Sequence, residues 1–571
     1  MDDNDFSPDG GATLNFNFPY SGSEDLTNDA NASITNTFYA VNIAHDILYQ
    51  YGFDEASGNF QENNYGNGGA DNDFVLAINA LGIAENGASI RVPPDGTSPD
   101  IILSSWYKRK DEVVINSGSL SGTYSVAPSN FGLSFSTDIT ADLVLVEDTN
   151  DQGNSTDTHD ACDTLVNTAE LTGKIAVIRE TSACEFDAKV YAVEQAGAIA
   201  AIVVNDTPGQ PSSQEAVFLG VTTVIPSFLI NQTQGEAIID ALINGETINM
   251  TLPKDNLFDS GLDNLVLVHE YVHGLTIRLT GGASNSECLS GPEQMGEGWS
   301  DWYGLMLTMT PTDTPEMVRG VGTFILGQDA DAKGIRPFPY TTNTTLNPVT
   351  YADTNDEDTF SIPHGIGSIW SSILWDLTWK YIEKYGFDSD LYNGTGGNNK
   401  VIQVVTDGVK LLSCDPGFVD GRNAILASDQ ALTGGVDQCM IWEVFAARGV
   451  GLNASQGTSD SRYDQVEDFT FPPNTDPTLA NCQTLSVDDF SEIEDFKIFP
   501  NPTENILTIK TNHNLGDVSI TITAINGKII LNKKVVLSDQ FVLDLYDFRS
   551  GIYFLNIKGK SINFQEKIIK F

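Results

Sequence analysis

One short motif limits what this chain can fold into and do. Residues 259–301 contain the run V-H-E-Y-V-H-G, in which His269 and His273 lie four residues apart and flank Glu270. On a helix, residues four apart share a face, so both imidazoles can bind one metal ion while Glu270 lies beside it. The H-E-x-x-H spacing therefore predicts a zinc helix with a carboxylate next to the metal.

The flanking residues predict where this helix begins and ends. Asp259 or Ser260 can cap its start, and the Gly281-Gly282 pair ends it after Arg278. Apolar residues between these limits give the helix a side that can face a core: Leu262, Leu265, Val266 and Val272.

A catalytic zinc ion usually takes three protein ligands and leaves one position to water. The next segment, G-E-G-W-S-D-W-Y-G-L-M-L-T-M-T-P, predicts a second helix that stops at Pro311. Glu297 and Asp301 lie one turn apart on one of its faces. We expect Glu297 to be the third ligand and Asp301 to accept the free N–H of a ligating histidine.

A bare H-E-x-x-H motif also arises by chance on polar helix faces. This chain has six histidines, two of them in the motif, and a Glu-x-x-x-Asp helix follows after a short connection. These features favour a metal site over a merely polar helix face.

The motif belongs to longer segments, H-E-Y-V-H-G-L-T-I-R-L-T-G-G and M-G-E-G-W-S-D, with F-Y-A-V-N-I-A-H-D-I-L-Y-Q-Y-G-F-D upstream and G-I-R-P-F-P-Y, P-H-G-I-G-S-I-W-S-S-I-L-W-D-L and I-W-E-V-F-A-A-R-G-V-G downstream. In this order they resemble the fungalysin family of secreted zinc metallopeptidases, relatives of thermolysin. The resemblance covers most of residues 1–115 and 253–475. It implies a thermolysin-like metallopeptidase of two lobes, with a mixed N-terminal lobe at 1–116 and the zinc helices with a mainly helical lobe at 253–472.

The resemblance implies a zinc endopeptidase that acts on proteins or peptides. Zinc would lower the pKa of its bound water from about 15.7 toward neutrality, and Glu270 would take the proton and pass it to the leaving amine. His364, in S-I-P-H-G-I-G, would donate to the developing oxyanion, and Arg336 is also expected to face the cleft. The alternatives are a surface-displayed binding protein with a vestigial metal site and a metal-dependent hydrolase of esters.

The N-terminal lobe offers two weaker signals. The spacing of apolar residues predicts a helix at about 35–51, in which His45 is expected to be a packing residue rather than a ligand. Residues 86–92 are a candidate edge strand, which in thermolysin-like enzymes pairs with the extended substrate. An ordinary hairpin explains the same pattern. The family's preference for bulky apolar residues just after the cut is also carried over by resemblance.

Residues 117–252 have a different texture. After a β-rich stretch, L-T-G-K-I-A-V-I-R-E-T-S-A-C-E-F-D-A-K-V-Y-A-V-E-Q-A-G-A-I-A-A-I-V-V-N-D predicts a strand, a turn that carries a cysteine, a helix at 186–197 and a second strand. This segment resembles an α/β protease-associated domain inserted within the protease. Substrate docking or control of access to the cleft is one hypothesis for it, and a spacer is the other.

Residues 473–490 are rich in Pro, Asn, Asp and Thr and predict a linker. Residues 491–571 show alternating strands with an Asn526-Gly527 hairpin turn, which predicts an all-β sandwich. This part resembles the C-terminal sorting domain of the type IX secretion system. The resemblance implies contact with secretion machinery and a secreted or cell-surface location, and a generic binding sandwich is the alternative. The whole chain is thus expected to be a multidomain α+β protein.

Charge excludes several partners. The net charge is −49, which argues against nucleic acid or an anionic membrane. Residues 491–571 hold ten Lys and Arg against nine Asp and Glu, so they carry about +1 and the rest of the chain about −50. Many carboxylates are therefore free to bind Ca²⁺, but we expect most of them to form a solvated acidic surface.

The six cysteines contain no C-x-x-C pair, so they predict disulfides rather than a metal cluster. Proximity in sequence pairs Cys162 with Cys184 and Cys414 with Cys439, which leaves Cys288 with Cys482.

The start of the chain, M-D-D-N-D-F-S, is acidic and precedes no apolar stretch, so we expect it to lie close to the mature N-terminus. The longest apolar run, A-G-A-I-A-A-I-V-V, is too short to span a bilayer. No pattern resembles a coiled-coil seam, and the protein is expected to be a soluble monomer.

Overall fold

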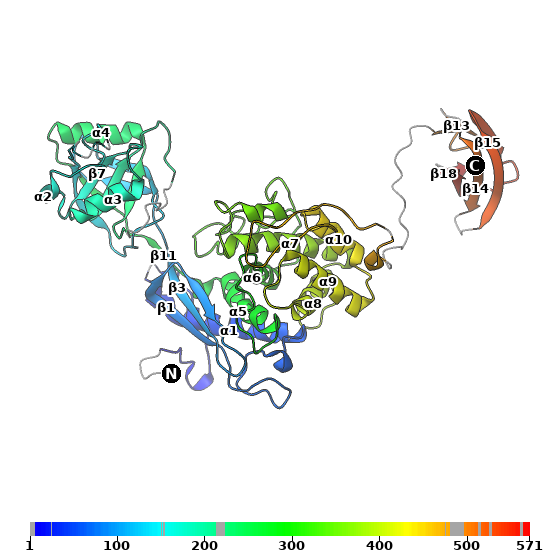
Figure 1. The fold of residues 1–571 in the computed structure, drawn as a ribbon, viewed down its shortest axis with the longest axis horizontal. Coiled ribbons are helices and arrows are strands. Elements are labelled where there is room, and N and C mark those ends of the chain that lie inside the picture. The colour runs from blue at the N-terminus through cyan, green and yellow to red at the C-terminus, as the bar shows by residue number, and fades with distance from the viewer. Residues whose placement is uncertain are drawn as a thin grey trace. The chain divides into compact units, whose positions relative to one another are not determined.

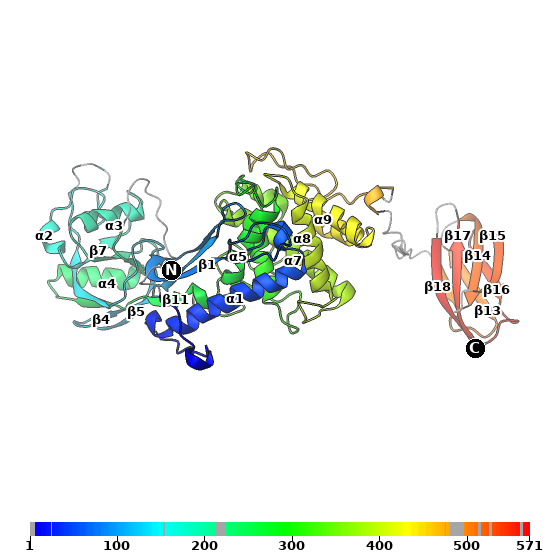
Figure 2. The same cartoon turned by 90° about the horizontal axis from the view of Figure 1, so that it is seen from below.

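The computed structural model describes residues 6–23, 25–149, 151, 153, 155–212, 223–473, 475–479, 496–511, 515–524, 528–559 and 563–571 (Figure 1). It divides into two compact units, Met1–Cys482 and Gln483–Phe571, each of which combines its own strands or helices into a separate core. The architecture mixes helices and sheets in the first unit and is all-β in the second (Figure 2).

The first unit begins with a long helix and a small sheet. Helix α1 (Ala30–Gln50) confirms the predicted helix and starts five residues earlier. The sheet comprises β1 (Leu76–Glu85), β2 (Ala88–Arg91), β3 (Asp100–Lys108) and β11 (Asn256–Asp259). Strand β3 is parallel to β1 and antiparallel to β2 and β11. Among the described strands β2 pairs only with β3, so its other edge is open.

Between β3 and β11 the chain forms a closed barrel in the strand order β10-β4-β5-β9-β8-β7-β6. Its strands are β4 (Glu112–Ile115), β5 (Gly122–Pro128), β6 (Ile139–Leu145), β7 (Ile175–Arg179), β8 (Ala200–Val204), β9 (Ser227–Ile230) and β10 (Asn249–Leu252). Its helices are α2 (Thr168–Leu171), α3 (Phe186–Gln195) and α4 (Gln232–Ile243). The predicted strand, turn, helix and strand are confirmed as β7, α3 and β8, with β7 parallel to β8. Strand β8 is buried throughout, as expected of a parallel strand covered on both faces.

Six helices form the remainder of the first unit: α5 (Asn264–Leu279), α6 (Gly296–Leu307), α7 (His364–Tyr385), α8 (Gly397–Lys410), α9 (Phe418–Thr433) and α10 (Gln438–Ala447). Short 3₁₀ turns lie at Gly11–Thr13, Leu26–Asp29, Glu55–Ser57, Ser260–Leu262, Tyr351–Asn355 and Pro477–Leu479. The core of this region contains four fully buried tryptophans, Trp299, Trp302, Trp370 and Trp375.

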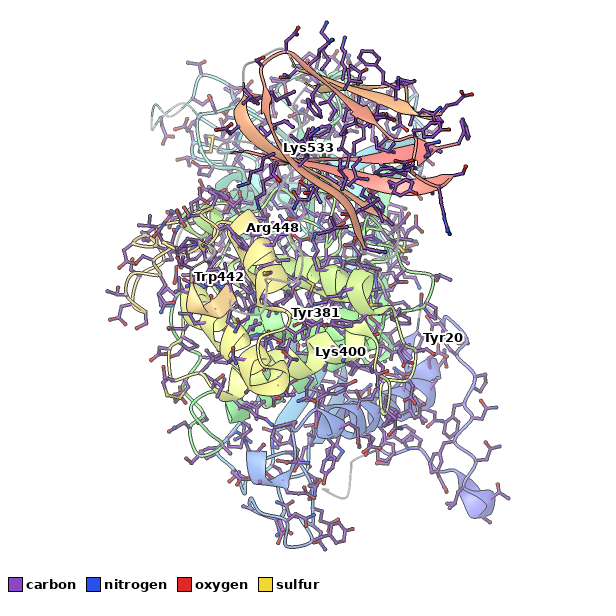
Figure 3. The ribbon with its side chains drawn as sticks, turned by 90° about the vertical axis from the view of Figure 1, so that its right-hand side faces the viewer. Tyr20, Tyr381, Lys400, Trp442, Arg448 and Lys533 are labelled. Carbon is purple, nitrogen blue, oxygen red and sulfur yellow. A yellow bond between two sulfur atoms is a disulfide. The ribbon has the colours of Figure 1, made fainter. Side chains whose placement is uncertain are left out.

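Buried arginines tie loops to these helices. Arg448 follows α10, where Figure 3 labels it. It donates from Nη1 to the carbonyl oxygens of Asn347 and Val349, at 2.9 and 2.8 Å. Its Nε donates to Asp376 on α7 at 2.7 Å. Because a guanidinium offers five donors in a fixed fork, one side chain can satisfy several buried acceptors at once.

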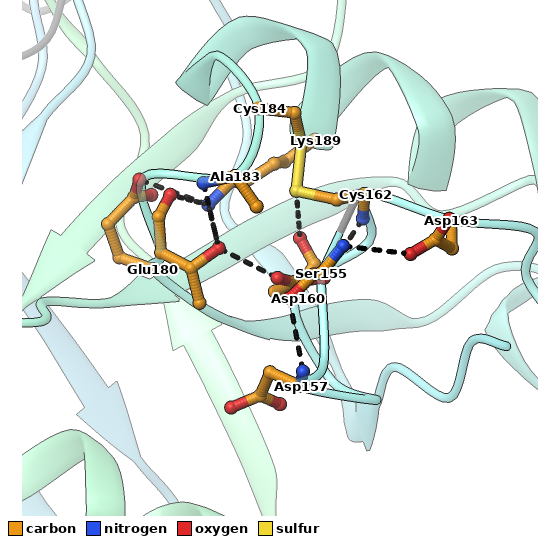
Figure 4. Close-up of a disulfide and its surroundings, with 10 residues drawn as sticks. Ser155, Asp157, Asp160, Cys162, Asp163, Glu180, Ala183, Cys184 and Lys189 are labelled. Atoms are coloured by element: carbon orange, nitrogen blue, oxygen red, sulfur yellow. Dashed lines mark hydrogen bonds and ion pairs between the residues drawn. A yellow bond between two sulfur atoms is a disulfide. The ribbon is translucent and has the colours of Figure 1, made fainter. Parts of the chain in front are cut away.

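Two disulfides lie within the described residues. Cys162 is bonded to Cys184, as proximity predicted (Figure 4). Cys288 is bonded to Cys414, so both predicted pairings of these two cysteines were wrong. Gly281, in the turn after α5, packs against this disulfide, and a Cβ there would lie only 2.6 and 2.9 Å from the sulfurs of Cys288 and Cys414.

The remaining predicted disulfide cysteines and the predicted linker lie near the end of the first unit. Cys439 is also disulfide-bonded, whereas Cys482 and most of the predicted linker at 473–490 lie outside the described residues.

No helix in the described part of the chain combines the length and apolar character that a bilayer crossing requires.

The second unit contains two antiparallel sheets, β12-β13-β16 and β15-β14-β17-β18. The strands are β12 (Phe496–Phe499), β13 (Ile506–Thr511), β14 (Gly516–Ala524), β15 (Ile529–Leu537), β16 (Gln540–Asp544), β17 (Gly551–Lys558) and β18 (Asn563–Lys570). In β14 alternate residues Val518, Ile520 and Ile522 are buried, the period-two pattern of a strand with one face in a core. The predicted Asn526-Gly527 turn lies outside the described residues.

Helices α6 and α7 approach each other through glycines. A Cβ at Gly298 would lie 2.3 Å from the carbonyl oxygen of Gly367, so backbone would have to move. We predict that Gly298→Ala lowers stability by about 1–3 kcal/mol, the usual cost of overpacking, and this can be measured as a lower thermal midpoint.

The matched control is Gly408→Ala on α8, where the nearest atoms to an added Cβ are the side-chain Cγ1 and the backbone nitrogen of Ile425, both at 3.3 Å. This contact is 1 Å looser than the one at Gly298, and helix propensity favours alanine by about 1 kcal/mol, so the midpoint should fall much less than in Gly298→Ala. Equal losses in the two variants would contradict the proposed contact.

Candidate metal centre

Helix α5 places two imidazoles side by side. His269 and His273 lie one turn apart, and their Nε2 atoms are 3.0 Å from each other. Asp263 caps the start of this helix by accepting the N–H of Val266 at 3.2 Å. The predicted N-terminal cap, Asp259 or Ser260, was therefore wrong. Asp259 instead caps the short 3₁₀ turn that precedes α5.

Helix α6 adds a carboxylate to the two imidazoles. Glu297 Oε2 lies 3.2 Å from His269 Nε2, and Glu297 Oε1 lies 3.6 Å from His273 Nε2. Zinc bonds of 2.0–2.1 Å in a tetrahedron separate ligand atoms by about 3.3 Å, so these spacings fit one ion. Within the described residues, only this trio gathers at least three metal-ligating side chains so closely.

Asp301 lies behind the metal site, fully buried. Its Oδ1 is 2.8 Å from His269 Nδ1, the ring nitrogen that points away from the other ligands. Its carboxylate also accepts Arg336 Nε at 2.7 Å and Arg336 Nη2 at 2.8 Å, and the Tyr340 hydroxyl donates to it. The structure thus places Asp301 where it can fix the orientation and tautomer of His269.

Arg336 contributes more than a charge at the cleft wall. It is almost completely buried, and its Nη2 also donates to Glu297 Oε2 at 3.2 Å. The sequence analysis missed the contacts of Arg336 and Tyr340 with Asp301. The only sequence signal for these two residues was the segment G-I-R-P-F-P-Y, because no helical spacing relates a loop residue to its partner.

The two histidines have opposite electrostatic environments in the absence of a metal ion. Burial disfavours the charged ring of His269, but Asp301 and Glu297 outweigh it and raise the pKa to about 10. For His273, burial dominates and lowers the pKa to about 4. Burial also opposes the charge of Glu297, yet the neighbouring His269, His273 and Arg336 hold its pKa well below the usual range.

Glu270 is not a member of the ligand set. It is buried next to His269, and burial raises the pKa of its carboxyl to about 7. A carboxyl group with such a pKa can both accept and donate a proton near neutral pH.

Glu270 and His269 open onto a cleft of about 380 Å³. One wall is made by Asn86, Gly87 and Ala88 at the start of the open-edged strand β2, where residues 86–92 were proposed as an edge strand. Apolar side chains line part of the rest: Trp106, Val266, Val321, Ile325 and Ile335.

His364 is the first residue of α7 and lies on the same cleft. Its Nε2 is 3.4 Å from Glu297 Oε1, and burial lowers the pKa of the ring, which favours the neutral form. More than half of the side chain is exposed to the cleft and solvent. His45, by contrast, interacts with Asp46 and Gln61 and does not line this cleft.

Comparison with known proteins identifies the family. The model of the fungalysin metallopeptidases (M36) matches residues 2–454. The chain belongs to the fungalysin metallopeptidase family. A second model, for a secretion system C-terminal sorting domain, matches residues 497–570, and the protein is accordingly secreted or extracellular.

Fungal extracellular metalloproteinases are among the curated relatives of this chain. Extracellular metalloproteinase MEP of Pyricularia oryzae is 29% identical over 77% of this chain and 46% of that protein. Extracellular metalloproteinase 2 of Arthroderma gypseum is 27% identical over 82% of this chain and 51% of that protein. Extracellular metalloproteinase mep of Aspergillus flavus is 28% identical over 80% of this chain and 49% of that protein. The chain spans about half the length of the curated relatives it matches.

Because His269 has a pKa of about 10 without metal, it carries a proton at about pH 7.5, and zinc binds only the neutral ring. Zinc binding to the metal-free fungalysin chain should therefore release the His269 proton, in addition to any proton that the zinc-bound water loses, and the affinity should rise with pH. Calorimetry in two buffers of different ionisation enthalpy measures this release.

The matched variant is Asp301→Asn, which removes a carboxylate that raises the pKa of His269. It should release fewer protons per zinc ion than the unmutated chain at the same pH and bind zinc about 10–100-fold more weakly. Unchanged proton release in Asp301→Asn would show that this carboxylate does not hold the proton on His269.

Proposed function

We propose that this fungalysin-family chain is a zinc endopeptidase that cleaves peptide bonds of extracellular proteins. The observation that carries the proposal is the position of Glu270 on the cleft wall, beside three side chains that fit one zinc ion. The names of the fungal relatives point the same way, since each is an extracellular metalloproteinase.

Each residue has a distinct part in the proposed mechanism. His269, His273 and Glu297 would hold the zinc ion. When bound, zinc acidifies water and polarises the scissile carbonyl. Glu270 accepts the proton of the attacking water and delivers it to the leaving amine, and burial raises the pKa of its carboxyl, which suits both roles.

His364 is proposed to donate its Nε2–H to the oxygen of the scissile carbonyl as negative charge develops there. Its place at the N-terminus of α7, across the cleft from Glu270, supports this role. The low pKa of the ring keeps it neutral, so the ring can donate without repelling a bound metal ion.

The cleft walls suggest how a substrate binds. The open edge of β2 can pair with an extended peptide backbone, which recognises main chain and tolerates many side chains. The apolar side chains Val266, Val321 and Ile335 would receive a bulky apolar residue just after the scissile bond.

The barrel is proposed to be a protease-associated domain at residues 117–252, inserted in the metallopeptidase at 1–116 and 253–472. Its support is topological, because the chain leaves the sheet after β3 and returns in β11, which pairs directly with β3. The second unit is proposed to be the sorting domain read by the type IX secretion system, with a linker at 473–490 before residues 491–571.

The decisive variant is Glu270→Gln. It removes the proton acceptor but none of the zinc ligands, so zinc content and thermal midpoint should hold while casein hydrolysis falls nearly to background. Glu62→Gln, at an exposed glutamate, should behave as the unmutated chain does. Normal turnover by Glu270→Gln would contradict the assignment of Glu270 as the general base.

The activity itself is tested by casein cleavage with zinc content before and after 1,10-phenanthroline. About one zinc per chain, with activity that falls with the chelator and returns with zinc, is the expected result. Bound zinc without cleavage would favour a binding protein, and turnover of esters but not peptides would favour an esterase.

His364→Ala should lower kcat by about 100-fold with little change in KM, because the lost contact forms only as the oxyanion develops. Steady-state kinetics on one peptide substrate measures both parameters. His45→Ala is the matched control, an imidazole outside the cleft, and should leave kcat unchanged. A larger effect on KM than on kcat for His364→Ala would instead assign the ring to substrate binding.

A further inference from the structure

A second hollow adjoins the cleft at the candidate metal centre. It has a volume of about 380 Å³ and shares four lining residues with the cleft: Ile335, Arg336, Ser361 and His364. The rest of its lining consists of Lys333, Pro337, Phe338, Thr359 and Gly365. Because the two spaces have a wall in common, a peptide that extends from the metal site past His364 would enter this hollow.

The charged groups that line the hollow are all cationic. Lys333 and Arg336 belong to its lining, and no acidic residue does. The charge of Arg336 is already matched, because its guanidinium donates to Asp301 and Glu297. Lys333 is exposed, and its side chain forms no ion pair or hydrogen bond within the part of the chain that the structure describes. Lys333 is therefore the cation that is free to bind a ligand.

Two further features of the hollow favour an anion. The Ser361 hydroxyl lies in the shared wall, is exposed, and has no hydrogen-bond partner among the described residues. Helix α7 begins at this wall with His364, and the N-terminus of a helix carries partial positive charge. Asp331 and Asp358 are exposed on the same loops, but neither lines the hollow. In a chain of net charge −49, this local excess of positive charge can select ligands by sign.

We propose that Lys333, together with Ser361, binds a carboxylate of the substrate on the leaving-amine side of the scissile bond. This inference rests on the proposed peptidase function and adds a specificity to it. Ile335 lines both spaces and is proposed to contact the residue just after the cut, so the hollow beyond it would receive the following residue.

The carboxylate has two sources in a peptide. An acidic side chain at the second residue after the cut supplies one, and the C-terminus of a peptide that ends at this residue supplies the other. An exposed ion pair changes affinity by about 1.4- to 5-fold, and salt weakens it. The expected specificity is therefore a preference, and neutral peptides remain substrates.

Peptide kinetics with the zinc-loaded full chain test this preference. One pair of peptides carries Glu or Gln as the second residue after the cut, with further neutral residues and an amidated C-terminus. A second pair ends at that position with a neutral residue, as a free acid or as an amide. In at least one pair kcat/KM should be about threefold higher for the peptide with the carboxylate, and about 0.5 M NaCl should reduce the difference. The pair that shows it identifies the source.

Variants of Lys333 assign the preference to this side chain. Lys333→Gln should abolish it, whereas Lys333→Arg, the matched control that keeps the charge, should retain it. Lys333→Glu should reverse it, so that the neutral peptide of the pair is the better substrate. Equal kcat/KM within both pairs for the unmutated chain, or an undiminished preference in Lys333→Gln, would overturn the proposal and leave Lys333 as a solvated surface residue.

Binding measurements separate this proposal from the proposed function. If the chain cleaves none of these peptides, the peptidase assignment is at fault. Calorimetry of the same pairs with zinc-loaded Glu270→Gln then tests Lys333 without turnover. The peptide with the carboxylate should bind about threefold more tightly than its neutral partner, and Lys333→Gln in this background should remove the difference. Equal binding within both pairs would overturn the proposal.

Discussion

The buried carboxylate of Asp301 is the contact on which the candidate metal centre depends. It links α6 to α5 through His269 and links both helices to the loop of Arg336 and Tyr340. The charge of Arg336 offsets much of the cost of burying Asp301 and Glu297 side by side. The same arginine lines the cleft, so the electrostatic support of the ligands and the shape of the proposed substrate site are set by one residue.

The position of Glu297 depends on packing as well as charge. A Cβ at Gly367 on α7 would lie 2.4 Å from the Cβ of Glu297, so the third ligand and α7 can be this close only because the residue is glycine. The same helix begins with His364. A ligand and the proposed oxyanion donor are therefore held by one tightly packed helix pair, and protein interiors of this density transmit small shifts.

Local spacing was enough to predict the candidate ligands, whereas features that depend on long-range packing could not be predicted from the sequence. His269, His273 and Glu297 could be chosen because helical periodicity puts residues four apart on one face, and the structure brings all three together. The cap at Asp263 was missed because Asp259 fits the same rule four residues earlier and caps a shorter turn. Disulfide partners and the closure of the barrel depend on which distant segments meet, information that no local pattern contains.

Carboxylates in the interior of this acidic chain are paired in a consistent way. With few basic residues available, carboxylates in the first unit are matched to buried arginines: the buried Asp73 to Arg278 at 3.1 Å, and the partly buried Asp376 to Arg448 at 2.7 Å. Other buried acids accept backbone N–H groups, as helix caps do. The few arginines of the interior are thus placed where carboxylates are withdrawn from water, which is where a charge without a partner would cost the most free energy.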